Sequence, residues 1–102
     1  MDEVLDFIDK FKWRFPKEQE AIFTEGNCYY FAVILRERFL GKIYYLPIVN
    51  HFICKIGKEY YDITGKANLG NEKPWDWEEY QKEEPLGSSR IIRDCIRFDT
   101  RR

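Results

Sequence analysis

The chain has 102 residues, with 17 basic and 18 acidic side chains, a formal net charge of -1 and an aromatic share of 18%. This length allows one domain, 1–102, with a single hydrophobic core, and the many large rings can supply much of its buried area. No long basic block is present, which argues against a nucleic-acid partner. The first residues are acidic and lack a long apolar run, so we expect neither a signal peptide nor a membrane span, and a cytoplasmic protein by default.

Apolar residues in the first third of the chain recur at helical spacing. Over residues 3–14 they predict an amphipathic helix that Pro16 stops. The polar residues 16–26 indicate a connection, in which 17–22 leave room for one helical turn. The clearest pattern follows, with apolar side chains at i, i+3, i+4, i+7 and i+11, namely Cys28, Phe31, Ala32, Leu35 and Phe39. It predicts a largely buried central helix that begins at Cys28 behind an Asn27 N-cap and ends with Gly41 as C-cap.

Three strands are predicted next, over residues 42–46, 50–56 and 59–64, with Pro47 separating the first two. Gly57 and Lys58 fit a two-residue type II′ turn, which pairs Ile56 with Glu59. Facing positions in this hairpin then sum to 115. The predicted pairs further along are Cys54 with Tyr61, Ile53 with Asp62, Phe52 with Ile63 and His51 with Thr64.

This register divides the hairpin side chains between two faces. One face is apolar and suited to a core, with Phe52, Cys54, Ile56, Tyr61 and Ile63. The other face carries His51, Ile53, Lys55, Tyr60, Asp62 and Thr64. His51 and Asp62 are then diagonal neighbours, whose Cα atoms are expected within roughly 7–8 Å and whose side chains can reach each other.

The last third of the chain is less regular. Gly65, like Gly57, is explained by turn geometry, and residues 70–71 mark a loop. Residues 74–80 predict a short helix with Pro74 near its first turn, docking Trp75 or Trp77 on the sheet. We interpret both tryptophans as packing residues, with a substrate groove as the alternative. Residues 88–98 fit either a helix or a strand.

The cysteines limit the chemistry that the chain can perform. Three of them without an export signal indicate reduced thiols and not a disulfide framework. The chain has one histidine, His51, and no close Cys-x-x-Cys pair, so we predict no metal site and no cofactor. Cys54 and Cys95 are interpreted as core residues.

Cys28, His51 and Asp62 together predict a catalytic triad. A thiol at the start of a helix meets unpaired N–H groups and the positive end of the dipole, which favour the thiolate. His51 would take the thiol proton, and Asp62 would fix the imidazole tautomer. The backbone N–H of Cys28 would donate to the oxyanion. Candidates for a second donor or a substrate contact are Asn27, Gln19 and Tyr29.

Three segments resemble the small papain-fold cysteine hydrolases, which include the NlpC/P60-like and transglutaminase-like proteins and papain-fold toxin domains of bacteria and phages. They are residues 26–32 around Cys28, 50–53 around His51 and 60–65 around Asp62, within roughly residues 24–66. The resemblance implies a minimal papain-like α+β fold, with the cysteine on a central helix and the histidine and acid on a small antiparallel sheet. The chain departs from papain in lacking a glutamine immediately before the cysteine, and it is short for a peptidase of this class.

Two functional hypotheses follow. The first is a cysteine-dependent acyl-transfer enzyme that forms a thioester with a protein or peptide substrate, as a peptidase, an amidase or deamidase, or a transglutaminase. The second is a non-catalytic binding protein on the same scaffold, such as a phage- or plasmid-encoded inhibitor that grips a protein partner through its aromatic surface. The sequence patterns leave both open.

Overall fold

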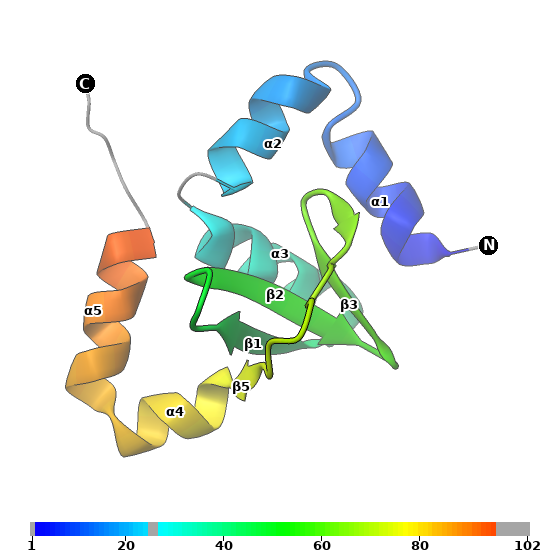
Figure 1. Cartoon of the computed structure of the whole chain (residues 1–102). Helices are drawn as coiled ribbons and strands as arrows, with labels where there is room; N and C mark the ends of the chain where they lie inside the picture. Colours follow the sequence, from blue (N-terminus) through cyan, green and yellow to red (C-terminus); the bar gives the residue numbers. More distant parts are fainter. Residues whose placement is uncertain (1, 25–26, 96–102) are drawn as a thin grey trace.

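Helices and a small antiparallel sheet make up the chain, as Figure 1 shows for the computed structural model, which describes residues 2–24 and 27–95. Three helices come first: α1 (Glu3–Phe11), α2 (Pro16–Thr24) and α3 (Cys28–Phe39). Five strands follow: β1 (Lys42–Leu46), β2 (His51–Ile56), β3 (Glu59–Asp62), β4 (Gly65–Lys66) and β5 (Trp75–Asp76). The chain continues into α4 (Trp77–Glu83) and α5 (Pro85–Cys95). The predicted α+β class is confirmed. No helix of the described part is long and apolar enough to cross a bilayer.

The N-terminal segment forms two helices, where the sequence predicted one helix and a polar connection. Helix α1 ends at Phe11, earlier than the predicted residue 14, and α2 begins at Pro16. Proline fits a first helical position because its missing N–H would have no partner there. Packing on the next helix stabilises α2: Phe23 contacts Phe31 of α3 with ring centroids 5.4 Å apart. The sequence pattern did not predict this helix because most of its residues are polar.

Helix α3 starts at Cys28 as predicted, but both of its ends differ in detail from the expectation. Asn27 has a left-handed backbone with φ of 64°, and its side chain makes no capping hydrogen bond. At the other end Leu40 is left-handed, with φ of 59°, so Gly41 is not the residue that reverses the chain. Gly41 is required for space, because a Cβ there would lie 2.6 Å from the Cys54 sulfur and 2.8 Å from the carbonyl oxygen of Lys55.

The strands are ordered β4-β3-β2-β1-β5, and all neighbouring pairs are antiparallel. The β2–β3 register is the predicted one: Cys54 faces Tyr61, Lys55 faces Tyr60 and Ile56 faces Glu59. Gly57 opens the turn with φ of 66°, as a type II′ turn requires.

Strand β3 is shorter than predicted. It ends at Asp62, which pairs with Gly65 of β4 across a tight turn at Ile63 and Thr64. The ladder with β2 ends at Cys54 and Tyr61, so the predicted pair of Ile53 with Asp62 is not part of it, and the predicted pairs of Phe52 with Ile63 and of His51 with Thr64 are wrong. The chain reverses before those residues can join the ladder with β2.

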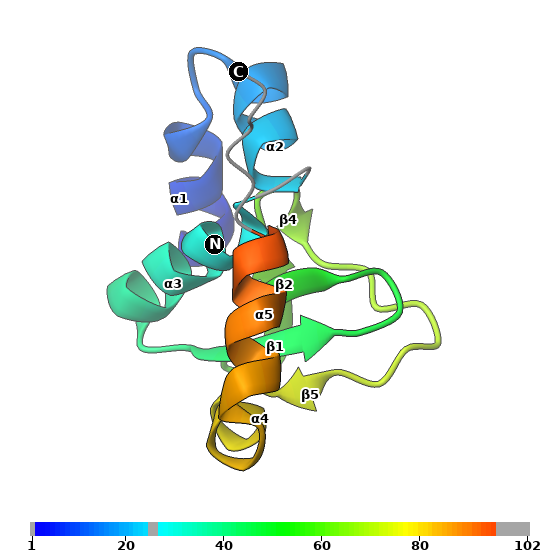
Figure 2. The same cartoon turned by 90° about the vertical axis from the view of Figure 1, so that its left-hand side faces the viewer.

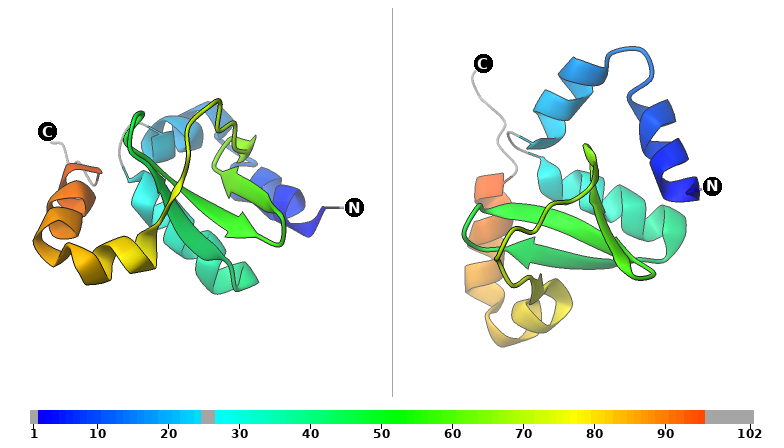
Figure 3. Two further views of the ribbon diagram at one scale, coloured as in Figure 1. Left: turned by 60° about the horizontal axis from the view of Figure 1, so that its bottom comes forward. Right: turned by 45° about the vertical axis from the view of Figure 1, so that its right-hand side comes forward.

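Different elements pack on the two faces of the sheet. We call these faces the α3 face and the opposite face. On the α3 face the helix buries two apolar clusters. One contains Val4, Ile8, Phe31, Leu35, Cys54, Tyr61 and Ile63, and the other contains Cys28, Ala32, Ile43, Tyr45, Phe52 and Trp77. The opposite face is crossed by the connection from β4 to β5, residues 67–74, which Figures 1 and 3 show passing over β2. Ile53 is 0% exposed, so the predicted polar face also has a buried part.

The segment after the connection adds an edge strand before it becomes helical. Trp75 pairs with Tyr45 and Asp76 pairs with Tyr44, so the helix predicted over 74–80 begins only at Trp77. Asp76 is its N-cap, with Oδ1 accepting a hydrogen bond of 3.3 Å from the backbone N–H of Glu79. Pairing with β1 keeps these residues extended, and the local sequence does not reveal that partner.

Helix α5 decides the ambiguous region in favour of a helix up to Cys95, and the rest of the predicted range, 96–98, lies outside the described residues. Figure 2 shows α5 in front of β1 and β2, at the end of the molecule where α3 and β2 begin. Ile91 and Ile92 of this helix pack against the buried cluster that contains Cys28. Helix α5 therefore covers the end of the molecule on which the predicted site depends.

Candidate functional site

His51 and Asp62 form a hydrogen-bonded pair on the opposite face of the sheet. His51 Nε2 lies 2.9 Å from Asp62 Oδ2, and the two side chains are 16% and 14% exposed. The predicted proximity of these residues is confirmed. Thr64 adds two hydrogen bonds to Asp62 Oδ1, from its backbone N–H at 2.9 Å and from its hydroxyl at 2.5 Å. Both carboxylate oxygens are thus held by the hairpin and the turn after it.

These contacts set the protonation state of Asp62. Burial by itself would raise the pKa of the carboxyl group, but the hydrogen bonds from His51 and Thr64 bring the pKa below its ordinary value. The carboxylate is therefore ionised at neutral pH and can only accept, so His51 Nε2 is the donor. Nδ1 is then the ring nitrogen that carries the lone pair of a neutral imidazole. A base on His51 has to act through Nδ1.

The turn before His51 is anchored on both sides. Asn50 has a left-handed backbone with φ of 54°, and its Oδ1 accepts a hydrogen bond from the hydroxyl of Tyr45. The backbone N–H of Ile48 donates to the carboxylate of Glu72 in the connection that crosses the opposite face. These bonds fix the start of β2 and with it the position of the imidazole.

Cys28 is the first residue of α3 and is 4% exposed. It shares a buried cluster with Phe52, which follows His51 in β2. Because side chains alternate along a strand, Phe52 under α3 directs His51 to the opposite face. Contact between the sulfur and the imidazole therefore has to be made around the first residue of β2. Figure 1 shows that α3 and β2 begin at the same end of the molecule, which is the arrangement such a contact needs.

The other two cysteines differ from Cys28 in position. Cys54 lies in the middle of β2, is 0% exposed, and burial raises the pKa of its thiol to about 11. This thiol is protonated at neutral pH, in keeping with the predicted core role. Cys95 is the last residue of α5, and its side chain lies outside the described part. Cys54 is a free cysteine.

The three candidates for a second oxyanion donor have different surroundings. Asn27 lies next to Cys28, and its side chain is not used to cap α3. Gln19 is half-buried in α2, more than a helical turn before the end of α2 that leads to Cys28. The ring of Tyr29 packs 5.0 Å from that of Phe52, which assigns it to the aromatic core. Asn27 is therefore the candidate whose place fits best.

One residue of the site was missed by the sequence reasoning, which gave Thr64 no role. Its two hydrogen bonds to Asp62 follow the common pattern in which an aspartate accepts from the residue two positions later. The spacing of Asp62 and Thr64 was the available signal. Among the described residues no group of three or more His, Cys, Asp or Glu side chains is arranged to hold a metal ion.

One comparison with known proteins gives a result. The model of the family described as Phage YunG-like protein matches residues 7–93, a range that includes Cys28, His51 and Asp62. No curated protein and no solved structure shows a significant match to the chain.

Proposed function

The chain belongs to the Phage YunG-like protein family, and we propose that it is a cysteine-dependent acyl-transfer enzyme with Cys28 as nucleophile, His51 as base and Asp62 as the residue that orients the imidazole. The observation that carries the proposal is the 2.9 Å hydrogen bond between His51 and an Asp62 that Thr64 also holds. A minimal papain-like scaffold, with the cysteine at the start of α3 and the pair on β2 and β3, completes the proposal. The substrate would be an amide group of a protein or peptide.

The proposed reaction starts with transfer of the Cys28 thiol proton to Nδ1 of His51. The thiolate attacks the carbonyl carbon of the amide, and the backbone N–H of Cys28 donates to the resulting oxyanion. The imidazolium, stabilised by Asp62, then gives its proton to the leaving amine as the C–N bond breaks. Water or a second amine attacks the thioester, loses a proton to His51 and releases the Cys28 thiolate. Hydrolysis, deamidation and transamidation share the first half of this sequence.

The second candidate function is a non-catalytic binding protein, and the burial of Cys28 favours it. A side chain that is 4% exposed and packed with Phe52 and Trp77 can serve as a small core residue. On this hypothesis the hydrogen bond between His51 and Asp62 stabilises the β2–β3 hairpin. The protein would then act through its exterior.

Alkylation kinetics separate the two functions. We expect iodoacetamide at pH 6 to modify Cys28 several-fold faster than free cysteine, because only a thiol with a lowered pKa is ionised there. Mass spectrometry of the digested protein assigns the reaction to individual cysteines, and Cys54 is the internal control that should stay unmodified. His51→Ala should abolish the rate enhancement, and Tyr60→Phe on the same hairpin should preserve it.

Two results would support the binding protein. One is a Cys28 that reacts no faster than free cysteine across the pH range in the folded protein. The other is an enhancement that persists in His51→Ala, since the helix terminus alone would then account for it. Circular dichroism of each variant confirms that the fold is intact in the comparison.

A further inference from the structure

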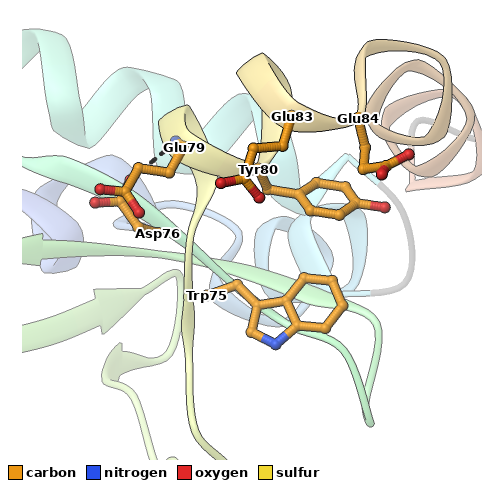
Figure 4. A pocket seen from close by; sticks show the side chains of 6 residues that line it. All are labelled: Trp75, Asp76, Glu79, Tyr80, Glu83 and Glu84. Carbon is orange, nitrogen blue, oxygen red and sulfur yellow. Dashed lines mark hydrogen bonds between the residues drawn. The ribbon is translucent and has the colours of Figure 1, made fainter.

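A cavity of about 450 Å³ lies where β5 meets α4, away from His51 and Asp62. Figure 4 shows its lining as two aromatic rings with carboxylates along the helix side. The lining residues are Trp75, Asp76, Glu79, Tyr80, Glu83 and Glu84, which we call the acidic aromatic pocket. They come from one continuous stretch of chain: Trp75 and Asp76 from β5, three residues from α4, and Glu84 from the C-cap of that helix.

The aromatic part of the pocket is a single wall. The ring centroids of Trp75 and Tyr80 are 5.1 Å apart at an interplanar angle of 39°, so the rings touch and no ligand fits between them. Trp75 also packs on Tyr45 of β1 at 5.9 Å, which fixes its position at the sheet edge. It nevertheless stays 40% exposed. A tryptophan that is fixed by packing and still partly exposed to solvent can contact a ligand without first having to be ordered.

The carboxylates around this wall carry more charge than the protein neutralises. Lys42 pairs with Asp76 at 2.9 Å, while no ion pair within residues 2–24 and 27–95 reaches Glu79, Glu83 or Glu84. Glu79 and Glu83 are four positions apart on one helix, where like charges destabilise. The pocket thus joins an open indole with three uncompensated negative charges.

We propose that the acidic aromatic pocket binds the guanidinium group of an arginine side chain from a peptide or protein partner. A guanidinium stacks on an aromatic face and donates in pairs to carboxylates, and it is less strongly hydrated than the ammonium of lysine. The charge and the ring wall complement both properties. This site needs no reaction at Cys28, so it stands independently of the acyl-transfer proposal.

A second acidic cavity in the same chain supplies a matched control. It has a volume of about 290 Å³ and is lined by Asp2, Leu5, Asp6 and Asp9, with no aromatic ring. One carboxylate is ion-paired in each cavity, Asp6 with Lys10 at 3.1 Å here and Asp76 with Lys42 in the acidic aromatic pocket. Among the described residues no ion pair reaches the other carboxylates of either lining. If negative charge alone were sufficient, both cavities would bind a cation. The proposal requires the aromatic wall as well, so only the pocket at Trp75 should bind.

The test is an NMR titration of the ¹⁵N-labelled full chain with the peptide acetyl-Gly-Arg-Gly-amide. The indole N–H signal of Trp75, assigned with the Trp75→Phe variant, should shift and saturate. The same peptide with citrulline, which is neutral and nearly isosteric, should bind at least tenfold more weakly, and the lysine peptide should fall between them. Cys28→Ala should bind the arginine peptide as the unchanged protein does, which separates this site from the nucleophile.

Two double variants with the same change in charge complete the test. Glu83→Gln with Glu84→Gln should weaken binding of the arginine peptide at least tenfold, because these exposed side chains flank the wall. Asp6→Asn with Asp9→Asn should change the affinity less than twofold. The proposal is overturned by the absence of a saturable Trp75 shift, by equal binding of the citrulline peptide, or by equal weakening in the two variants, which would indicate only long-range attraction.

Discussion

The α3 face and the opposite face of the sheet share strand β2 but have different compositions. On the α3 face Phe52, Cys54 and Trp77 are each less than 2% exposed and pack among apolar neighbours. On the opposite face β2 contributes His51, which is hydrogen-bonded to Asp62, and the connection formed by residues 67–74 passes over this strand. Alternation of side chains along the strand produces this division.

The division shows where the protein obtains its stability and where it keeps its reactive groups. Burial of rings and aliphatic side chains under α3 supplies the larger favourable term, since the hydrophobic effect scales with apolar area. On the opposite face His51 and Asp62 are polar groups that need hydrogen-bond partners. Thr64 donates to Asp62, and the turn at Asn50 leads directly into His51. Substitutions on the two faces should therefore change the free energy of unfolding by different amounts and with a different dependence on pH.

The largest effect is expected for Phe52→Ala on the α3 face. The ring is 1% exposed and lies 4.6 Å from that of Trp77, so its loss leaves a cavity in the core. The free energy of unfolding should fall by about 3–5 kcal/mol. Urea denaturation followed by tryptophan fluorescence measures the loss. Ile48→Ala in the exposed turn before β2 is the control, and a similar loss there would contradict the difference between the two regions.

A smaller effect is expected when volume is added to the same face. Gly41→Ala places a methyl group 2.8 Å from the carbonyl oxygen of Lys55, which is backbone and cannot move aside cheaply. The free energy of unfolding should fall by about 1–3 kcal/mol.

Gly87→Ala provides the comparison for this variant. The atom closest to its new methyl group is the hydroxyl oxygen at the end of the Tyr80 side chain, at 2.9 Å, while Glu84 Cβ lies at an ordinary contact distance of 3.6 Å, and the site is helical. Alanine is favoured over glycine in a helix by roughly 1 kcal/mol. Thermal unfolding of both variants should show a lower midpoint for Gly41→Ala alone. Equal midpoints would contradict a tight contact between β2 and the connection from α3 to β1.

The smallest effect and the only pH-dependent one is expected on the opposite face, for Asp62→Asn. The pKa of Asp62 is lowered in the folded protein, so its charged hydrogen bonds stabilise the fold above the carboxyl pKa of the unfolded chain, near 3.8. Asp62→Asn should cost about 1–2 kcal/mol at pH 7. This difference should shrink as the pH falls through the lower pKa of the folded state. Urea denaturation at a series of pH values from 7 to 3 measures this difference in the free energy of unfolding, with Asp9→Asn as the exposed control. A difference that does not change with pH would contradict a stabilising role of the Asp62 charge.

Local patterns in the sequence predicted much of the candidate site. The spacing of apolar residues placed Cys28 at the start of α3, and the two-residue turn at Gly57 set the register of β2 and β3. From that register the pairing of His51 and Asp62 followed, because a hairpin turn fixes which residues are neighbours across two strands. The roles of Gly41 and Thr64 were missed, since one depends on the distance to β2 and the other on where β3 stops.

The sequence by itself determined the elements whose signals are local: the central helix, the hairpin and the face that each of its side chains occupies. Only the tertiary structure decided that polar residues 16–24 form a helix, that Trp75 joins the sheet beside Tyr45, and that residues 67–74 pass over β2. Each of these depends on contacts with another element of the fold. Periodicity and turn chemistry report on neighbours within a few residues, whereas such contacts exist only after the layers have packed.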